Sequence, residues 1–158
     1  HKGGGGFMLG STKTHLQGLR TLARSSKCLV VSVDYRLTPE YTYPSQIEDA
    51  WAITKWASKY AYKFGGDPRL QAIGGDSAGG SLAQCSAFSA KYGNGPDIAC
   101  QVLFYPGMDP LMTLEETKAM ALSPTLKCRD ISFFMSHYFN PWDEWMRVDW
   151  RADPLPAP

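Results

Sequence analysis

The residues with the clearest chemical potential lie in AIGGDSAGGSLA, residues 72–83. Gly75, Ser77 and Gly79 follow the pattern G-x-S-x-G, in which a serine occupies a sharp turn between a strand and a helix. Glycines beside the serine avoid Cβ clashes in such a turn, and the helix amides and dipole favour the negative charge of a tetrahedral intermediate. The pattern predicts Ser77 as a nucleophile. The alternative is a glycine-rich strand-to-helix turn, such as one that holds phosphate.

A second glycine run opens the chain with the sequence HKGGGGF, residues 1–7. Residues without side chains leave their backbone amides accessible, and a loop of this type forms the other wall of an oxyanion hole next to a G-x-S-x-G turn. Because the two motifs occur together, we interpret the glycine run as an oxyanion loop. A flexible terminal segment is the alternative.

The elements around these motifs predict an α/β fold. Short apolar runs alternate with helix-forming stretches in the order strand, helix, strand, helix, strand, which is typical of right-handed βαβ units in a parallel sheet. The expected elements are a strand over Cys28–Tyr35, a helix from Pro44 to the glycines at 65 and 66, a strand in residues 70–75, a helix from Ala78 to about Tyr92, and a strand over Cys100–Tyr105.

The pattern changes beyond Pro106. One helix rich in aromatic residues is predicted from about Asp130 to Tyr138, with much loop around it. The tail RADPLPAP, residues 151–158, contains three prolines, which prevent regular secondary structure. We interpret this tail as a linker.

The composition limits the classes of function. Sixteen Lys and Arg residues nearly balance fifteen Asp and Glu residues, and no basic run is interleaved with aromatics, so no nucleic-acid partner is expected. The four cysteines are widely spaced without a C-x-x-C pair, which disfavours a metal site and a disulfide framework. No apolar run approaches the ~18 residues that a membrane span requires. These features favour a reduced, cytoplasmic protein.

Four stretches together resemble a known family, namely HKGGGGF, VVSVDYRLTPE, YPSQIEDAWAITKWA and GGDSAGGSLA. They are similar to the motifs of the hormone-sensitive-lipase branch of the α/β-hydrolase fold. The resemblance implies a three-layer α/β sandwich with a mainly parallel sheet. It also implies a serine carboxylic-ester hydrolase that acts on short- to medium-chain acyl esters without a cofactor.

The resemblance also implies roles for individual residues. Ser77 resembles the nucleophile, and the amide of Ala78 resembles one oxyanion donor. Two further donors are expected from the glycine run, at Gly4, Gly5 and Gly6. The loop carries two residues more than the family pattern HGGGF, so the register of the donors stays open between these glycines. Four residues in the VDYRLTPE stretch are expected to be structural rather than catalytic: Asp34, Tyr35, Arg36 and Glu40.

The acid and the histidine of a catalytic triad have no clear candidates in the sequence. The triad of this fold runs Ser, Asp or Glu, then His, and the only histidine after Ser77 is His137, which we interpret as a packed or surface residue of the aromatic helix. His15, in a predicted surface helix, precedes the serine. Asp109 matches an aspartate that the family does not use in its triad, and Asp153 falls in the tail before the expected position of the acid.

The sequence therefore predicts a hydrolase domain that is incomplete at both ends. Residues 1–107 are expected to form the core with the oxyanion loop and the serine turn, residues 108–150 a cap or helical segment, and residues 151–158 a linker to a further part. The open sheet edges of such a domain would favour self-association.

Two other functions are consistent with the sequence. Plant gibberellin receptors are similar to this family and have lost the histidine, so a non-catalytic small-molecule-binding module is one alternative. An interaction role for the aromatic-rich stretch SHYFNPWDEWMRVDW, residues 136–150, is the other.

Overall fold

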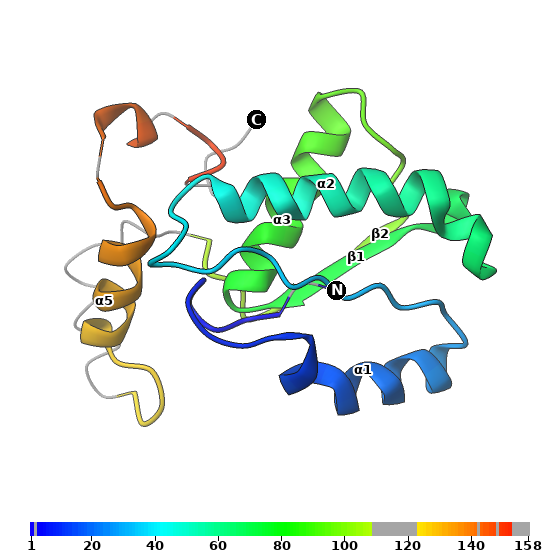
Figure 1. Ribbon diagram of the computed structural model, residues 1–158, viewed down its shortest axis with the longest axis horizontal. Helices are drawn as coiled ribbons and strands as arrows, with labels where there is room; N and C mark the ends of the chain where they lie inside the picture. The colour runs from blue at the N-terminus through cyan, green and yellow to red at the C-terminus, as the bar shows by residue number, and fades with distance from the viewer. Residues whose placement is uncertain (2, 109–122, 142, 148, 153–158) are drawn as a thin grey trace.

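The computed structural model describes residues 1, 3–108, 123–141, 143–147 and 149–152 (Figure 1). Asp109, Asp153 and the prolines of the tail lie outside the described residues. The helices are α1 (Thr12–Ser26), α2 (Ser45–Tyr60), α3 (Ala78–Tyr92) and α5 (Cys128–Tyr138), the strands are β1 (Ala72–Asp76) and β2 (Cys100–Phe104), and short 3-10 helices cover Ala61–Phe64, Pro68–Leu70 and Glu144–Arg147.

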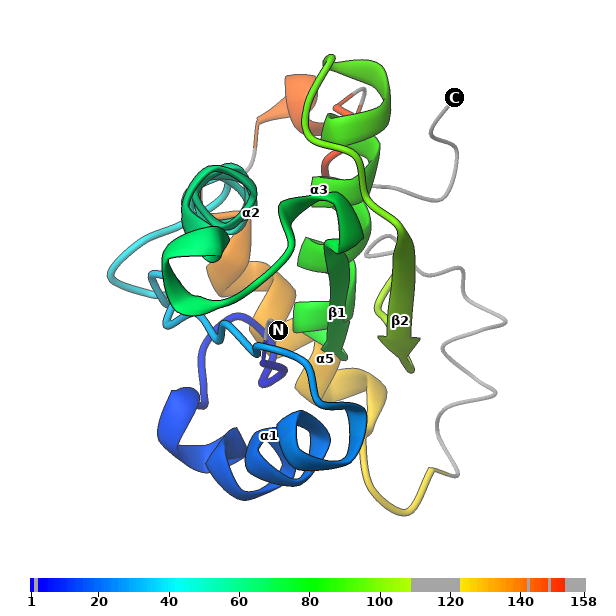
Figure 2. The same cartoon turned by 90° about the vertical axis from the view of Figure 1, so that its right-hand side faces the viewer.

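The centre of the fold is a β1–α3–β2 unit. The two strands pair in parallel, with Ala72 opposite Cys100 and Asp76 opposite Phe104. In Figure 1, α2 and α3 lie above the strand pair and α1 lies below it, and Figure 2 shows β1 and β2 running side by side in front of α3. The predicted α/β architecture with parallel strands is confirmed. The predicted bounds of α3 agree with the structure, and those of β2 and α5 agree within two residues.

The residues of α3 are small because both of its sides are packed. Ten of its fifteen residues are buried, and most of them are Gly, Ala or Ser. A Cβ added at Gly80 would lie 2.9 Å from the Pro106 side chain, so this helix can approach the segment after β2 only without a side chain there. Close packing of α3 fixes the position of its first turn, which directly follows Ser77.

The main hydrophobic core lies between α2, α3 and α5. Its fully buried members include Ala50, Leu82 and Cys85, and aromatic side chains from distant parts of the sequence complete it: Phe7, Tyr35, Tyr43, Tyr138 and Phe139. A smaller cluster of Ile73, Ala83 and Ala87 joins α3 to the strands. The larger core therefore connects the glycine loop at the start of the chain to α5 near its end.

The predicted strand over Cys28–Tyr35 is wrong. Within the described residues this segment forms only one bridge, at Val33, whose N–H donates to the His1 carbonyl at 3.3 Å, while the His1 amino group donates to the Val31 carbonyl at 2.6 Å. An apolar, β-branched composition favours a strand, but a strand also requires a neighbouring backbone along its length. Here His1 supplies the only backbone partner of the ladder among the described residues.

Asp34 and Tyr35, at the end of the same segment, make contacts that support the fold. The Asp34 carboxylate accepts hydrogen bonds from the amide and the hydroxyl of Thr12 at the start of α1, where amides lack helical partners. The Tyr35 hydroxyl donates to the Gly3 carbonyl at 2.8 Å. Glu40 is exposed. Asp34 and Tyr35 thus anchor α1 and the glycine loop to the middle of the chain.

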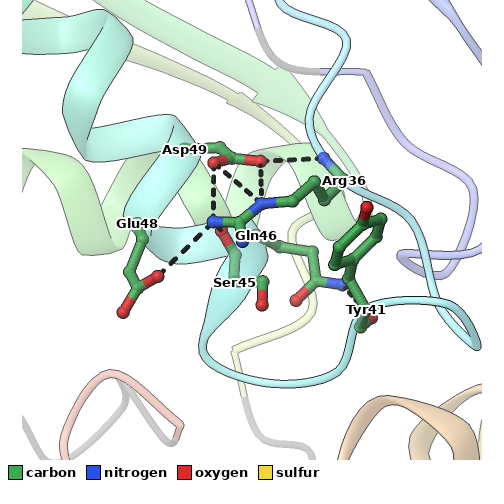
Figure 3. Close-up of polar contacts among 6 residues, drawn as sticks. All are labelled: Arg36, Tyr41, Ser45, Gln46, Glu48 and Asp49. Carbon is green, nitrogen blue, oxygen red and sulfur yellow. Dashed lines mark hydrogen bonds and ion pairs between the residues drawn. The ribbon is translucent and has the colours of Figure 1, made fainter.

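Arg36 attaches the same segment to α2 (Figure 3). Its Nε lies 2.9 Å from Asp49 Oδ2, its Nη2 lies 2.8 Å from Asp49 Oδ1, and its backbone amide donates to the same carboxylate. Glu48 Oε2 lies farther away, 3.4 Å from Arg36 Nη2, and the Glu48 side chain is more exposed than that of Asp49. Burial alone would raise the pKa of Asp49, but the hydrogen bonds from Arg36 outweigh burial and lower it.

We expect the Arg36–Asp49 contact to make stability depend on pH in the acid range. Because the folded-state pKa of Asp49 lies below its unfolded value of about 4, its contribution to the free energy of unfolding is present above that pH and disappears as pH falls through the folded pKa. Asp49→Asn should lower the free energy of unfolding by about 1–3 kcal/mol at pH 7. Urea unfolding of both proteins from pH 7 to pH 3 measures the difference, which should shrink below about pH 4.

Glu48→Gln is the matched control for this prediction. Because Glu48 is mostly exposed, its substitution should change the free energy of unfolding by less than about 1 kcal/mol at every pH. A difference between wild type and Asp49→Asn that stays constant down to pH 3 would contradict the prediction.

None of the helices in the described part of the chain combines the length and apolar character needed to cross a bilayer.

Candidate active site

Ser77 occupies a strained turn between β1 and α3. Its φ of 51° and ψ of −124° lie in a region that residues with a side chain rarely adopt, and such a conformation costs about 1–3 kcal/mol. The turn is held from both sides, since the Ser77 amide donates to the Phe104 carbonyl of β2 and the Ser77 carbonyl accepts from the Ser81 amide of α3. These two hydrogen bonds hold the turn in its strained conformation. Ser77 therefore lies between the carboxyl end of β1 and the N-terminus of α3.

The glycine loop lies directly against this turn. A Cβ added at Gly4 would lie 2.4 Å from Asp76 Oδ2, 2.8 Å from the Asp76 carbonyl oxygen and 3.1 Å from Ser77 Cβ. Beyond Gly4 the chain turns sharply, with positive φ values at Gly5 (122°), Gly6 (60°) and Phe7 (62°). Glycine is required at Gly4 by close approach and at Gly5 and Gly6 by conformation as well as by space.

A cavity of about 460 Å³ opens where the glycine loop meets the serine turn. Gly5, Gly6, Ser77 and Ala78 all line it, and Gly4 does not. The remaining lining is largely apolar and comes from α2, α3, α5 and the segment after β2, including Ile47, Leu82, Tyr105, Met108, Ile131, Phe134, Met135 and Tyr138. The structure therefore brings the candidate serine, the amide of Ala78 and two of the three candidate glycines to one apolar cavity.

Cys85 lines the same cavity from α3 but is not a reactive thiol. Burial and the nearby Asp149 carboxylate raise the pKa of the Cys85 thiol to about 12, so it stays protonated near neutral pH. Its sulfur donates to the Arg151 carbonyl at 3.4 Å. Cys85 is thus an apolar wall residue.

A polar cluster holds the segment after residue 148 against the cavity. The Tyr43 hydroxyl donates to Asp149 Oδ2 at 2.5 Å, and the Arg151 guanidinium donates to both oxygens of the same carboxylate. Burial would raise the pKa of Asp149, but the hydrogen bonds from Arg151 and Tyr43 lower it overall. The charged pair therefore fixes Arg151 and Ala152, which line the cavity.

The three histidines do not line the cavity of Ser77. His137 lies on α5, where its Nδ1 is 2.8 Å from the Phe133 carbonyl and its ring packs against the Phe133 ring. His15 lies on α1, as predicted, and its Nε2 is 3.5 Å from Asp76 Oδ1. The Nε2 of His1 lies 3.4 Å from the same oxygen. The Nε2 atoms of His1 and His15 thus both lie near the carboxylate of Asp76, the residue before the serine.

Metal-binding residues are not assembled in the part of the chain that the structure describes. No three His, Cys, Asp or Glu side chains there come close enough together to hold a metal ion. Among the described residues, the cavity that Ser77 lines is mostly surrounded by backbone, hydroxyl and apolar groups, with Arg151 as its charged side chain.

Sequence reasoning did not find the residues that shape the cavity. Ile47, Leu82 and Cys85 were expected only as part of helices, and Phe134 and Tyr138 only as part of an aromatic helix. A signal was present in the unusual density of aromatic residues between Phe133 and Phe139, but it does not reveal which ring faces the glycine loop.

Comparisons with curated proteins identify relatives along most of the chain. The esterase LipI of Mycobacterium tuberculosis is 41% identical over 140 residues, which cover 89% of this chain and 44% of the relative. The carboxylic ester hydrolase LipN of the same organism is 39% identical over 163 residues, which cover 98% of this chain and 41% of the relative. The chain thus spans less than half the length of these two relatives.

Solved structures that are named as esterases also superpose on this chain. A hyperthermophilic esterase from the archaeon Pyrobaculum calidifontis superposes with a TM-score of 0.91 at 35% identity, covering 99% of this chain and 50% of that one. Carboxyl esterase 2 from the fungus Tuber melanosporum gives a TM-score of 0.88 at 32% identity, covering 98% of this chain and 50% of that one. Residues 2–158 match the family described as alpha/beta hydrolase fold. The family that the four sequence motifs indicated is therefore confirmed, and this chain belongs to the α/β-hydrolase fold family.

Proposed function

We propose that this chain carries the nucleophile and the oxyanion hole of a carboxylic-ester hydrolase, with Ser77 as the nucleophile. The observation that carries the proposal is the strained conformation of Ser77 in the lining of an apolar cavity, because backbone strain of this kind clusters at active sites. The relatives named as esterases and carboxylic ester hydrolases support the same reaction class.

The proposed oxyanion donors are the amides of Gly5, Gly6 and Ala78. All three residues line the cavity with Ser77, and Ala78 begins α3, where the amides have no partner within the helix and the dipole favours negative charge. Gly4 has a different role in this proposal. It lies against Asp76 and Ser77, where its missing side chain allows the loop to approach.

The proposed substrates are esters of short- to medium-chain acids. The cavity volume of about 460 Å³ and its lining of Ile, Leu, Met and aromatic side chains fit an apolar acyl chain of limited length. Among the residues that the structure describes, Arg151 is the one charged side chain in the cavity lining, and its guanidinium is bound to Asp149. An uncharged acyl group therefore suits the site better than a charged one.

Because no described histidine lines the cavity, we propose that the general base that activates Ser77, and the acid that orients it, come from residues outside this chain. A serine hydroxyl at its ordinary pKa is a weak nucleophile without such a base. The same observation favours the second candidate, a binding module that keeps the cavity without the chemistry.

Labelling with a fluorophosphonate tests the proposal, because an oxyanion hole alone supports slow phosphonylation of a serine, and a general base makes the reaction fast. The folded chain is incubated with the reagent, and intact mass and peptide mapping locate any adduct. We expect one adduct on Ser77, which Ser77→Ala abolishes and Ser81→Ala retains. Ser81 is the matched control, since it lines the same cavity but donates its hydroxyl to the Gly107 carbonyl.

The rate of labelling also tests the location of the base. Slow labelling at Ser77 would agree with a base outside the chain, whereas labelling as fast as in a complete serine esterase would contradict it. A folded chain that stays unlabelled but binds an apolar ester in the cavity would overturn the hydrolase proposal in favour of the binding module.

A further inference from the structure

We infer that Phe134 of α5 is a positioning residue that holds the oxyanion loop in its working conformation by packing against Gly6. The inference rests on the proposed function, since it assigns a mechanical support to the proposed donors. It connects a helix near the end of the chain to a loop at its start.

The first observation is the contact between the Phe134 ring and Gly6. A Cβ added at Gly6 would lie 2.4 Å from Phe134 Cγ and 2.6–2.7 Å from both Cδ atoms, so the ring covers the space that a side chain would occupy. The three nearest atoms to this position all belong to Phe134. The ring therefore takes the place of a side chain at Gly6 and limits the movement of this residue toward α5.

The second observation is a parallel contact one residue later and one helical turn farther along α5. Phe7 stacks on Tyr138, with ring centroids 3.9 Å apart and an angle of 8° between the rings. Tyr138 is buried, and its carbonyl accepts from the Tyr43 amide at 2.8 Å. Residues four apart on a helix lie on the same face, so Phe134 and Tyr138 together present one aromatic face to the loop.

The loop needs external support because its conformation is unfavourable. Positive φ angles at three consecutive residues, Gly5, Gly6 and Phe7, include one residue with a side chain, for which this region is disfavoured. Within the loop, the Gly5 carbonyl accepts from the amides of Met8 and Leu9, which closes the turn but does not fix it relative to Ser77. Outside the loop, the Phe7 carbonyl accepts from the Thr38 amide at 2.9 Å, and contacts from α5 add a restraint on Gly6 and on the Phe7 ring.

Small displacements of this loop would have large effects on the reaction. A hydrogen bond to an oxyanion tolerates only a few tenths of an ångström, and a misplacement of about 1 Å can lower a rate about 100-fold. Truncation of Phe134 removes the ring from Gly6 and leaves the amides of Gly5 and Gly6 free to move away from the developing charge.

Phe134 also lines the cavity, so its positioning role must be separated from a role as a wall for the acyl group. A wall residue changes how well a ligand binds, which appears in the half-saturating concentration of the reagent. A positioning residue changes the maximum rate of serine phosphonylation once the reagent is bound. The two quantities are obtained from the same labelling experiment at several reagent concentrations.

The test compares Phe134→Ala and Phe134→Leu with Phe133→Ala, each in the full 158-residue chain. Phe133 is the matched control because it is the neighbouring residue on α5 and is mostly exposed. We expect Phe134→Ala to lower the maximum labelling rate about 10- to 100-fold, and Phe134→Leu, which refills most of the volume, to recover most of the loss. Phe133→Ala should label like wild type. An unchanged maximum rate with a weaker half-saturating concentration would overturn the inference and leave Phe134 as a wall residue.

Amide hydrogen exchange of the loop provides a readout that does not depend on Ser77 chemistry. Exchange at Gly6 and Phe7 should become faster in Phe134→Ala, remain near wild type in Phe134→Leu and stay unchanged in Phe133→Ala. If wild type is not labelled at all, the proposed function fails while faster exchange in Phe134→Ala still supports the restraint. Unchanged exchange in that variant would contradict it.

Discussion

Replacing Gly4 by alanine is expected to lower the rate of phosphonylation of Ser77 at least about 100-fold. The added Cβ would lie 2.8 Å from the backbone carbonyl oxygen of Asp76, at the end of β1, and 2.4 Å from one of its carboxylate oxygens. A flexible side chain could move aside, but the Asp76 backbone belongs to the strand pair and precedes the strained Ser77. The glycine loop must therefore move away from the serine turn, and the amides of Gly5 and Gly6 move with it.

Gly18→Ala is the matched control for Gly4→Ala. Gly18 lies in α1, and a Cβ added there would meet no atom within 4 Å. Because alanine favours a helix over glycine, this substitution should raise the free energy of unfolding by up to about 1 kcal/mol and leave labelling of Ser77 unchanged. Circular dichroism and the melting temperature establish that each variant is folded before labelling is compared. A folded Gly4→Ala chain that labels at the wild-type rate would contradict the close approach of the loop to the serine.

Tyr138→Ala is expected to cause the largest loss of stability, about 3–5 kcal/mol in the free energy of unfolding, by analogy with other aromatic truncations in cores. Tyr138 is buried in the main core, stacks on Phe7 and makes edge contacts with Tyr43 and Phe139. Its removal leaves a cavity among aromatic side chains from three distant parts of the sequence. Because a small domain has only about 5–15 kcal/mol of net stability, such a loss is a large fraction of the total.

Urea or thermal unfolding measures this effect, with Tyr62→Ala as the control. Tyr62 has the same side chain but is 60% exposed, so its truncation should cost less than about 1 kcal/mol. Near-equal losses for the two variants would contradict the position of Tyr138 in the core. A chain that fails to fold only with Tyr138→Ala would agree with it.

The elements next to the serine were predictable because the information that forms them is local. The alternation of short apolar runs with helix-forming stretches identified β1, α3 and β2, and the glycines on either side of Ser77 identified the turn between the first two. The small residues of α3 were also visible in the sequence, since a helix of Gly, Ala and Ser is typical of close packing. The family followed from four motifs, of which one, GGDSAGGSLA, extends from β1 through the serine turn into α3.

The segment Cys28–Tyr35 illustrates where local information is insufficient. Its β-branched residues favour an extended backbone, but a strand exists only through hydrogen bonds to a neighbour, and among the described residues only His1 provides them. The composition of a segment predicts its preference for a strand, but it does not show whether a neighbouring backbone is present to pair with it. The same reason explains why the contacts of Arg36 with Asp49 on α2 became visible only in the structure.

The sequence by itself determined the family, the βαβ order around Ser77 and the identity of the two motifs that form the candidate site. The tertiary structure decided which glycines reach the cavity, which aromatic rings support them and which histidines do not line it. These features depend on contacts between the first 7 residues and residues more than 120 positions later, such as Phe7 with Tyr138 and Gly6 with Phe134. Hydrophobic periodicity specifies that a face of α5 is apolar, but only packing of the whole chain determines that this face meets the glycine loop.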